Sequence, residues 1–226
     1  MSFETPVLLI AWRRPHTTKE VIDSIRAVAP SRMFVACDGP DPRRSNEAGL
    51  VAGTRAMIAN EIDWPCMIER RYSEENQGCR LGVSNAISWF FEQVDEGIIL
   101  EDDCVPHPDF FPYCAELLGR YRDDSRIWCI SGDNSAGIHL TGDWSYGFIR
   151  TPLIWGWATW RRAWKNYDDQ MLGWSDVRAT QLVEYIFNEP LERKLLTGFF
   201  DELLDADGPD TWGTRWSCSA LLSSGL

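Results

Sequence analysis

Short apolar runs alternate with amphipathic stretches through the first 130 residues, and this alternation restricts the fold more than any other feature. Helical periodicity separates runs that are typical of buried strands. Strand–helix–strand repeats are joined by right-handed crossovers, so the pattern predicts an α/β fold with a mostly parallel sheet flanked by helices. The strands are expected at 7–11, 33–37, 66–69, 97–100 and 127–130, and the helices at about 18–28, 46–60, 82–94 and 109–121.

The second half of the chain lacks this regular alternation. Gly and Trp interrupt residues 146–164, and an acidic amphipathic stretch at about 180–204 precedes a last helical pattern at about 211–224. No linker separates the halves, so we expect a single domain over residues 1–226. The chain stops where a helix cap would ordinarily lead into another element, which favours truncation at the C-terminus.

The charge balance excludes some partners. With 22 basic and 34 acidic residues the formal charge is −12, which argues against nucleic acid, because phosphate backbones are bound by basic surfaces. Acidic clusters can instead recruit divalent cations. The seven cysteines are scattered without CxxC spacing, which favours a reducing compartment over disulfides or zinc. No apolar run could span a bilayer or serve as a signal peptide, so we expect no transmembrane segment and a cytoplasmic location.

Polar residues follow the predicted strands directly. Arg13 and Arg14 follow the first strand, Asp38 the second, and the triplet 101–103 (EDD) the fourth. Parallel sheets bind ligands beyond the carboxyl ends of their strands. Three adjacent carboxylates repel one another unless a cation neutralises them, and hard oxygen ligands suit Mn²⁺ or Mg²⁺. The alternative is an acidic loop that leads into the next helix, with Asp109 as its N-cap.

Three stretches are similar to one enzyme family. GIILEDDCVPHPDFFPYCAELL resembles the metal-binding strand and following helix of GT-A glycosyltransferases, particularly the N-acetylglucosaminyltransferase of complex N-glycan assembly and its bacterial relatives. TPVLLIAWRRPHTTKEVIDSI and FVACDGP resemble the nucleotide-binding strands of the same group. The resemblance implies a GT-A (nucleotide-diphospho-sugar transferase) fold. It also implies metal-dependent, inverting transfer of a hexosyl or N-acetylhexosaminyl group from a UDP-sugar to a hydroxyl of a glycan or other acceptor.

The resemblance assigns the nucleotide-sugar half to residues 1–130. Asp38 would accept the ring N–H of uracil, Asp102 would contact the ribose, and Asp103 would ligate Mn²⁺ or Mg²⁺. For Asp38 the alternative is turn chemistry, since Asp-Gly-Pro forms a turn by itself. For Arg80 it is a solvated cation at a helix start, where the helix dipole disfavours it. The residues expected to contact the donor nucleotide-sugar are Ala11, Arg14, Asp38, Arg80, Glu101 and Asp102.

Residues 131–226 would form the acceptor side. LIWGWATWRRAW resembles the family's Gly-Trp loop, which places Trp157 in the donor-sugar pocket, with core packing as the alternative. Inverting transfer needs a carboxylate that takes the acceptor's proton. In DGPDTWGTRW this resemblance makes Asp210 the catalytic base, with Asp207 as the fallback; the alternative for Asp210 is to cap the last helix. Many bacterial relatives carry an acid where this chain has Gly213.

Two other functions compete with an active glycosyltransferase. The absence of an acid at Gly213 is compatible with a catalytically inactive module that binds sugar nucleotides or glycans. A sugar nucleotidyltransferase would share an α/β nucleotide-binding fold. That class ordinarily has a Gly-rich basic loop after the first strand, and the corresponding stretch here, AWRRPHTT, contains no glycine.

Overall fold

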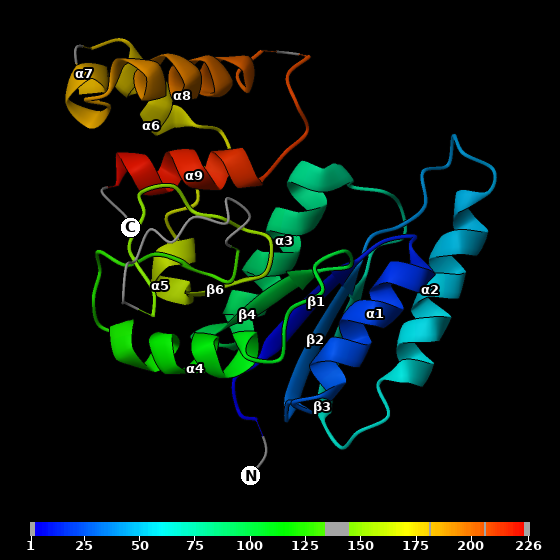
Figure 1. Ribbon diagram of the computed structural model, residues 1–226. Coiled ribbons are helices and arrows are strands. Elements are labelled where there is room, and N and C mark those ends of the chain that lie inside the picture. Colours follow the sequence, from blue (N-terminus) through cyan, green and yellow to red (C-terminus); the bar gives the residue numbers. More distant parts are fainter. Residues whose placement is uncertain (1–2, 134–144, 181, 206, 224–226) are drawn as a thin grey trace.

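A mostly parallel sheet crosses the centre of the molecule (Figure 1). The computed structural model describes residues 3–133, 145–180, 182–205 and 207–223. Within them the sheet has six strands in the order β3-β2-β1-β4-β6-β5; β1 to β4 are mutually parallel, and β6 is antiparallel to both β4 and β5. The predicted α/β class is confirmed. The strands are β1 Val7–Ala11, β2 Arg32–Cys37, β3 Met67–Tyr72, β4 Glu96–Glu101, β5 Ile130–Ser131 and β6 Trp157–Trp160.

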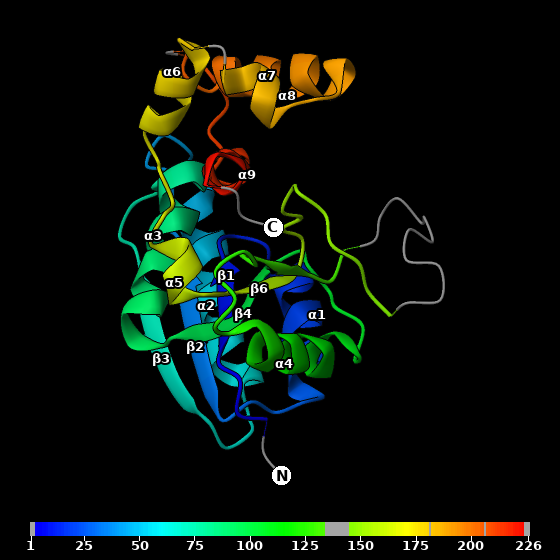
Figure 2. The same ribbon diagram turned by 90° about the vertical axis from the view of Figure 1, so that its left-hand side faces the viewer.

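Helices cover both faces of the sheet, as Figure 2 shows in edge view. One face carries α1, α2 and α4, and the opposite face carries α3, α5 and α9. Helices α6, α7 and α8 lie beyond α9, away from the sheet (Figure 1). The helices are α1 Pro15–Arg26, α2 Glu47–Glu61, α3 Gly78–Gln93, α4 Phe110–Tyr121, α5 Arg161–Trp164, α6 Leu172–Arg178, α7 Leu182–Ile186, α8 Pro190–Glu202 and α9 Gly213–Leu222.

Two hydrophobic cores lie on the two faces because successive side chains of a strand point to opposite sides. Val7 and Leu9 of β1 pack toward α1 and α4, whereas Leu8 and Ile10 pack toward α3 and α9. All five residues of β1 are buried, which is why the strand is continuously apolar instead of alternating. A third cluster joins α6, α7, α8 and α9 around Trp174 and Phe200.

The second half departs most from the sequence-based expectation. Strand β6 lies inside residues 146–164, where no strand was expected. It was missed because all four of its residues are buried, so no alternation of polar and apolar residues marks it. The predicted helical stretch at 180–204 is two helices, and α8 begins at Pro190. The end of the chain, where truncation was expected, lies outside the described residues. None of the described helices is long and apolar enough to cross a membrane.

Candidate functional site

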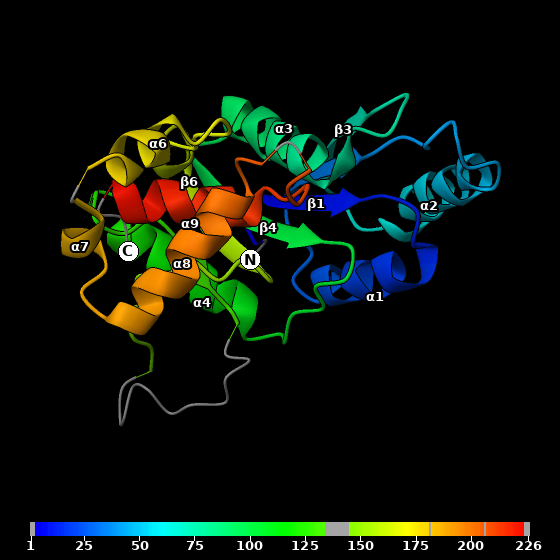
Figure 3. The ribbon, with the colours of Figure 1, turned by 90° about the horizontal axis from the view of Figure 1, so that it is seen from above.

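The carboxyl ends of β1, β2 and β4 meet at one edge of the sheet. Ala11, the last residue of β1, is in register with Cys37 of β2, and Ile10 is in register with Glu101 of β4. Figure 3 shows the arrowheads of β1 and β4 side by side and pointing the same way. The loops that leave these strands therefore bring the predicted residues of the donor site to a common edge. The carbonyl of Ala11 accepts the amide N–H of Asp38 (3.0 Å), which joins the ends of β1 and β2.

Asp102 and Asp103 differ in exposure although they are adjacent. The side chain of Asp102 is only 4% exposed; one oxygen accepts the amide N–H of Trp12 (3.1 Å), and the other is paired with Arg14. Burial raises the pKa of Asp102, and Arg14 opposes this shift. Asp103 is 50% exposed and pairs with the second guanidinium nitrogen of Arg14 (2.8 Å). The ribose contact predicted for Asp102 would therefore involve a carboxylate that already has two partners.

Glu101 carries the largest electrostatic perturbation in the triplet. Burial raises its pKa to about 7, and the negative charges of Asp103 and Asp102 add to the shift, whereas Arg14 and a hydrogen bond from Trp212 oppose it. Burial and neighbouring negative charges both raise the pKa of a carboxylate, and such perturbation is typical of functional sites. The triplet is therefore an anionic cluster that a single arginine only partly neutralises.

Asp38 is held by the chain segment that leads into α3. Its carboxylate accepts hydrogen bonds from the amide N–H of Gln77 (3.0 Å) and from the side chain of Asn76 (2.9 Å). Burial raises the pKa of Asp38, and the backbone hydrogen bonds oppose the shift. Gly39 is required next to it, because a Cβ there would lie 2.5 Å from backbone atoms of Glu75. Asp38 thus fixes two loops together, in addition to any contact with a base.

Asp210 also lies at the N-terminus of α3. Its two oxygens accept the amide N–H groups of Cys79 (2.8 Å) and Arg80 (3.3 Å), as an N-cap side chain would. The predicted alternative, a cap on α9, is wrong: that helix begins after Trp212, and no side-chain hydrogen bond caps it. Asp210 is exposed, so a ligand can reach its carboxylate. Asp207, the fallback base, is also exposed.

Arg80 is paired with a carboxylate that does not belong to the acidic triplet. Its guanidinium forms two hydrogen bonds with the Asp169 carboxylate, at 2.7 and 2.6 Å, which raise the pKa of Arg80. Asp169 lies between α5 and α6, in the half of the chain that was expected to face the acceptor. The donor contact predicted for Arg80 therefore competes with a bidentate ion pair. No local pattern marks Asp169 in the sequence, since its partner is 89 residues away.

Trp157 lies in the hydrophobic core of the described part of the chain. Its side chain is 0% exposed and stacks on Trp212 (5.6 Å between ring centroids), within the core formed with α3, α5 and α9. This corrects the predicted place of Trp157 at the donor sugar. The inward direction follows from strand β6, whose residues are buried on both faces. The nearby aromatic side chain that is open to solvent is Trp155, which is 67% exposed.

Gly213 is buried at the start of α9. A Cβ there would collide with the end of the Ile154 side chain, so any side chain at this position would require Ile154 to move. An acid at position 213 would thus have to displace an apolar group before it could reach a ligand. The packing therefore disfavours a side chain at position 213 through the end of one apolar side chain and not through the backbone.

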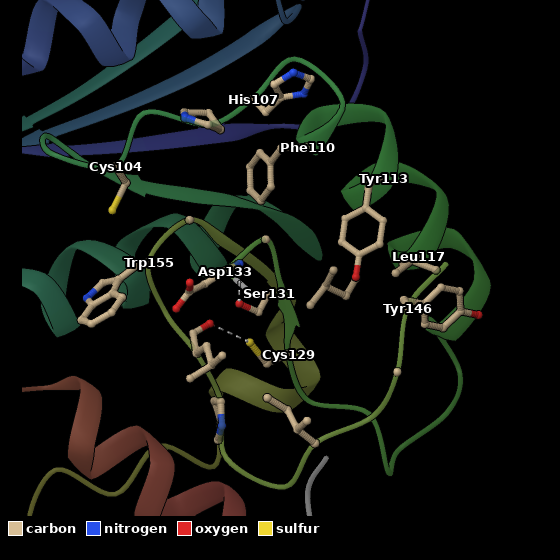
Figure 4. Close-up of a pocket in the computed structure, with 18 of the residues that line it drawn as sticks. Cys104, His107, Phe110, Tyr113, Leu117, Cys129, Ser131, Asp133, Tyr146 and Trp155 are labelled. Atoms are coloured by element: carbon tan, nitrogen blue, oxygen red, sulfur yellow. Dashed lines mark hydrogen bonds between the residues drawn. The ribbon is translucent and has the colours of Figure 1, made fainter. Parts of the chain in front are cut away.

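A cavity of about 1430 Å³ begins at Asp103 and extends along α4 (Figure 4). Phe110 and Tyr113 of α4 lie on one side of it, and Trp155 lies on the opposite side. His107 is at its rim; its side chain is 77% exposed and lies 3.3 Å from the carboxylate of Asp109. The aromatic lining was not predicted, because it combines α4 with a segment of irregular backbone.

Comparisons with known proteins find similarity to several solved structures, among them two enzymes. No family model matches the chain, and no curated protein matches it. The mannosyltransferase PcManGT from Pyrobaculum calidifontis, in complex with GDP-Man and Mn²⁺, is 13% identical over 97% of this chain and 70% of its own, with a TM-score of 0.49. The 4-diphosphocytidyl-2C-methyl-D-erythritol synthase from Anaerococcus prevotii is 10% identical over 88% of this chain and 85% of its own, with a TM-score of 0.40. Because both TM-scores lie below 0.5, neither similarity decides the activity.

Proposed function

We propose that this chain is a glycosyltransferase of the GT-A type that takes a sugar from a nucleoside-diphosphate donor. The observation that carries the proposal is the asymmetric pair at the end of β4. Asp102 is buried and paired with Arg14, whereas Asp103 is half-exposed at the mouth of a large cavity. The buried carboxylate of Asp102 can fix the loop, and the exposed carboxylate of Asp103 is free to reach a ligand. This arrangement suits a site where a metal ion binds a diphosphate.

The exposed carboxylate fits a divalent metal with few protein ligands. Among the described residues no three His, Cys, Asp or Glu side chains converge to hold an ion by themselves. Mg²⁺, and Mn²⁺ in similar sites, are commonly bound by one or two carboxylates, with substrate phosphates and water as the other ligands. Asp103 would hold the ion, which when bound stabilises the leaving diphosphate as a Lewis acid. The Arg14 guanidinium beside it would attract the same phosphates.

The remaining roles follow from position. The backbone of Ala11 and the carboxylate of Asp38 border the sheet edge where the nucleotide would lie, and the base is proposed to be uracil. Asp210 would take the proton of the acceptor hydroxyl, since it is an exposed carboxylate on the α3 side of the triplet. The thiol of Cys79 lies close enough to both Glu101 and Asp210 to be affected by their charges. Burial raises the pKa of Cys79 most, and the negative charges of these two acids raise it further.

Calorimetry of UDP binding with and without Mn²⁺ tests the proposal. The wild-type protein should bind UDP more tightly with Mn²⁺, because the acidic triplet otherwise repels the diphosphate. Asp103→Asn should remove this Mn²⁺ dependence. The matched control is Asp109→Asn, an exposed acid of the same loop, which should retain it. An unchanged response of UDP binding to Mn²⁺ in Asp103→Asn would refute the metal site.

A second assay separates activity from binding alone. Incubation with a panel of UDP- and GDP-sugars and Mn²⁺ should release nucleoside diphosphate slowly in water and faster with an acceptor. Tight UDP binding without any release would identify the chain as an inactive sugar-nucleotide-binding module.

A further inference from the structure

Four charged side chains are buried in the part of the chain that the structure describes: Asp41, Glu47, Asp102 and Arg215. The three acids each form an ion pair with an arginine. Arg215, only 5% exposed, forms no ion pair with any described carboxylate. Buried charges in proteins are ordinarily paired or bound to a ligand, because an unpaired buried charge is costly. The burial of the three acids is explained by their ion pairs, whereas the burial of the Arg215 charge is not.

The hydrogen bonds of Arg215 leave much of its guanidinium unused. One terminal nitrogen donates to the carbonyl of Leu203 (3.0 Å), and the Nε–H is buried without a partner. Burial lowers the pKa of Arg215 and the positive charge of Arg80 lowers it further, whereas the negative charges of Asp169 and Asp210 only partly oppose this shift. A guanidinium presents five N–H donors in a planar fork, which suits the oxygens of a carboxylate or phosphate.

Arg215 lines a cavity of about 400 Å³ between the start of α3 and the loop that precedes α9. Arg80, Asp169 and Asp210 form other parts of its wall. Asp169 is engaged by Arg80, and Asp210 accepts amide N–H groups of α3. The exposed Asp205 adds a further negative charge to the lining. Within the described wall, Arg215 is thus the buried charged side chain that forms no ion pair.

We propose that this cavity binds an oxyanion, a phosphate or a carboxylate, and that Arg215 is its principal contact. The bound group would supply the partner that Arg215 lacks, while Arg80 adds a second positive charge. The acids in the wall keep the affinity modest and restrict the anion to the Arg215 side. Resting on the proposed glycosyltransferase function, the inference further assigns this anion to the acceptor, since Asp210, the proposed base, borders the same cavity.

Thermal-shift measurements in EDTA, with ionic strength held constant by NaCl, test the anion site directly. Inorganic phosphate and acetate are the two probes, and the one that raises the melting temperature identifies the source chemistry. Wild-type protein should be stabilised in a concentration-dependent way, because a ligand bound by the folded state raises its stability. Arg215→Met should lose the response and melt at or above the wild-type temperature in NaCl alone, since an unpaired buried charge has been removed. The control Arg126→Met, an exposed arginine paired with Asp124, should keep the response.

Asp169→Asn provides a test in the opposite direction. Removing the carboxylate that occupies Arg80 should lower the apparent dissociation constant for the anion at least threefold. This result does not depend on whether Arg215→Met folds. Equal responses of wild type and Arg215→Met to both probes, or no response in either wild type or Asp169→Asn, would overturn the anion site.

The acceptor assignment has its own readout. In a transfer assay, Arg215→Met should raise KM at least tenfold for an acceptor that bears a phosphate or carboxylate. The KM of a neutral acceptor and the binding of UDP with Mn²⁺ should be unchanged. Equal KM changes for both acceptors would refute the assignment. Absent UDP binding in the wild type would instead reject the proposed function and leave the anion site standing.

Discussion

Asp210 shows how one carboxylate can have a structural and a chemical role at the same place. Its two hydrogen bonds to α3 cross 131 and 130 positions of sequence, so no local pattern could indicate them. The helix dipole favours a negative charge at a helix N-terminus, and the Asp210 side chain stays exposed to solvent while it caps α3. The cap and the proposed base are therefore compatible, and only paired substitutions can separate them.

Asp210→Ala and Asp210→Asn should differ in stability and agree in rate. Alanine removes both acceptors at the start of α3 and should cost about 0.5–2 kcal/mol, whereas asparagine retains one acceptor oxygen and should cost less. Both should lower turnover by roughly 10²–10⁴-fold if the carboxylate is the general base. Melting temperature and transfer rate per folded molecule are the measurements. A normal rate in Asp210→Asn would eliminate Asp210 as the base.

The site residues that follow buried strands could be predicted from the sequence. Contacts made by irregular segments of the second half could not. Arg14 and Asp103 meet because strands β1 and β4 are parallel neighbours, and parallel pairing follows from the α/β pattern. Arg80 meets Asp169, and Arg215 lines the same cavity, only because irregular segments fold back over α3. Trp157 was misplaced because a Trp beside glycine fits a binding loop and a buried strand equally well.

At the scale of the element, α3 depends on the glycine with which it begins. Gly78 has φ +80°, and a Cβ there would lie 2.5 Å from an oxygen of Asp210. The positive φ disfavours any side chain, and the close approach explains how a carboxylate reaches the helix start. The helix was predicted to begin at residue 82, because the glycines at 78 and 82 weaken the helical pattern. In the structure it begins four residues earlier, at Gly78.

Gly78→Ala should lower the free energy of unfolding by about 1–3 kcal/mol, because it combines strained backbone with displacement of Asp210. The matched control is Gly119→Ala in α4, where nothing lies within 4 Å of the added Cβ. That change should stabilise the protein by about 0.5–1 kcal/mol, since alanine favours a helix interior. Urea denaturation measures both. Two losses of equal size would show that the backbone at Gly78 carries no special strain.

Strand boundaries were predicted best where a short, continuously apolar run is buried on both faces of the sheet. The strands of the first half match within a few residues, and β1 matches its predicted range, because β1, β2 and β4 are short apolar runs between helices. Strand β3 extends beyond its predicted range into the polar residues Arg70 and Arg71. Strand β5 is shorter and later than the predicted 127–130, and β6 was missed altogether. Both pair antiparallel at one edge of the sheet, outside the strand–helix–strand repeats that made the rest recognisable.

At the scale of the whole molecule, a cluster of tryptophans joins the two halves of the sequence. Trp216 of α9 is 0% exposed and lies 5.4 Å from Trp128, 5.9 Å from Trp157 and 5.2 Å from Trp164, between ring centroids. The same core includes Leu8 of β1. Because residues 1–130 and 131–226 share this core, we expect neither half to be stable alone, as the predicted single domain requires.

Trp216→Ala should therefore destabilise the entire chain. Truncation of a fully buried Trp ordinarily costs about 3–5 kcal/mol, because the neighbouring rings cannot close the cavity completely. Urea unfolding followed by far-UV circular dichroism and by tryptophan fluorescence should give one coincident transition at a lower midpoint. Trp155→Ala, which removes an exposed ring, should shift the midpoint little. If the two probes instead separate in the wild type, with the first half melting independently, the tryptophan cluster does not unite the halves and the single-domain prediction fails.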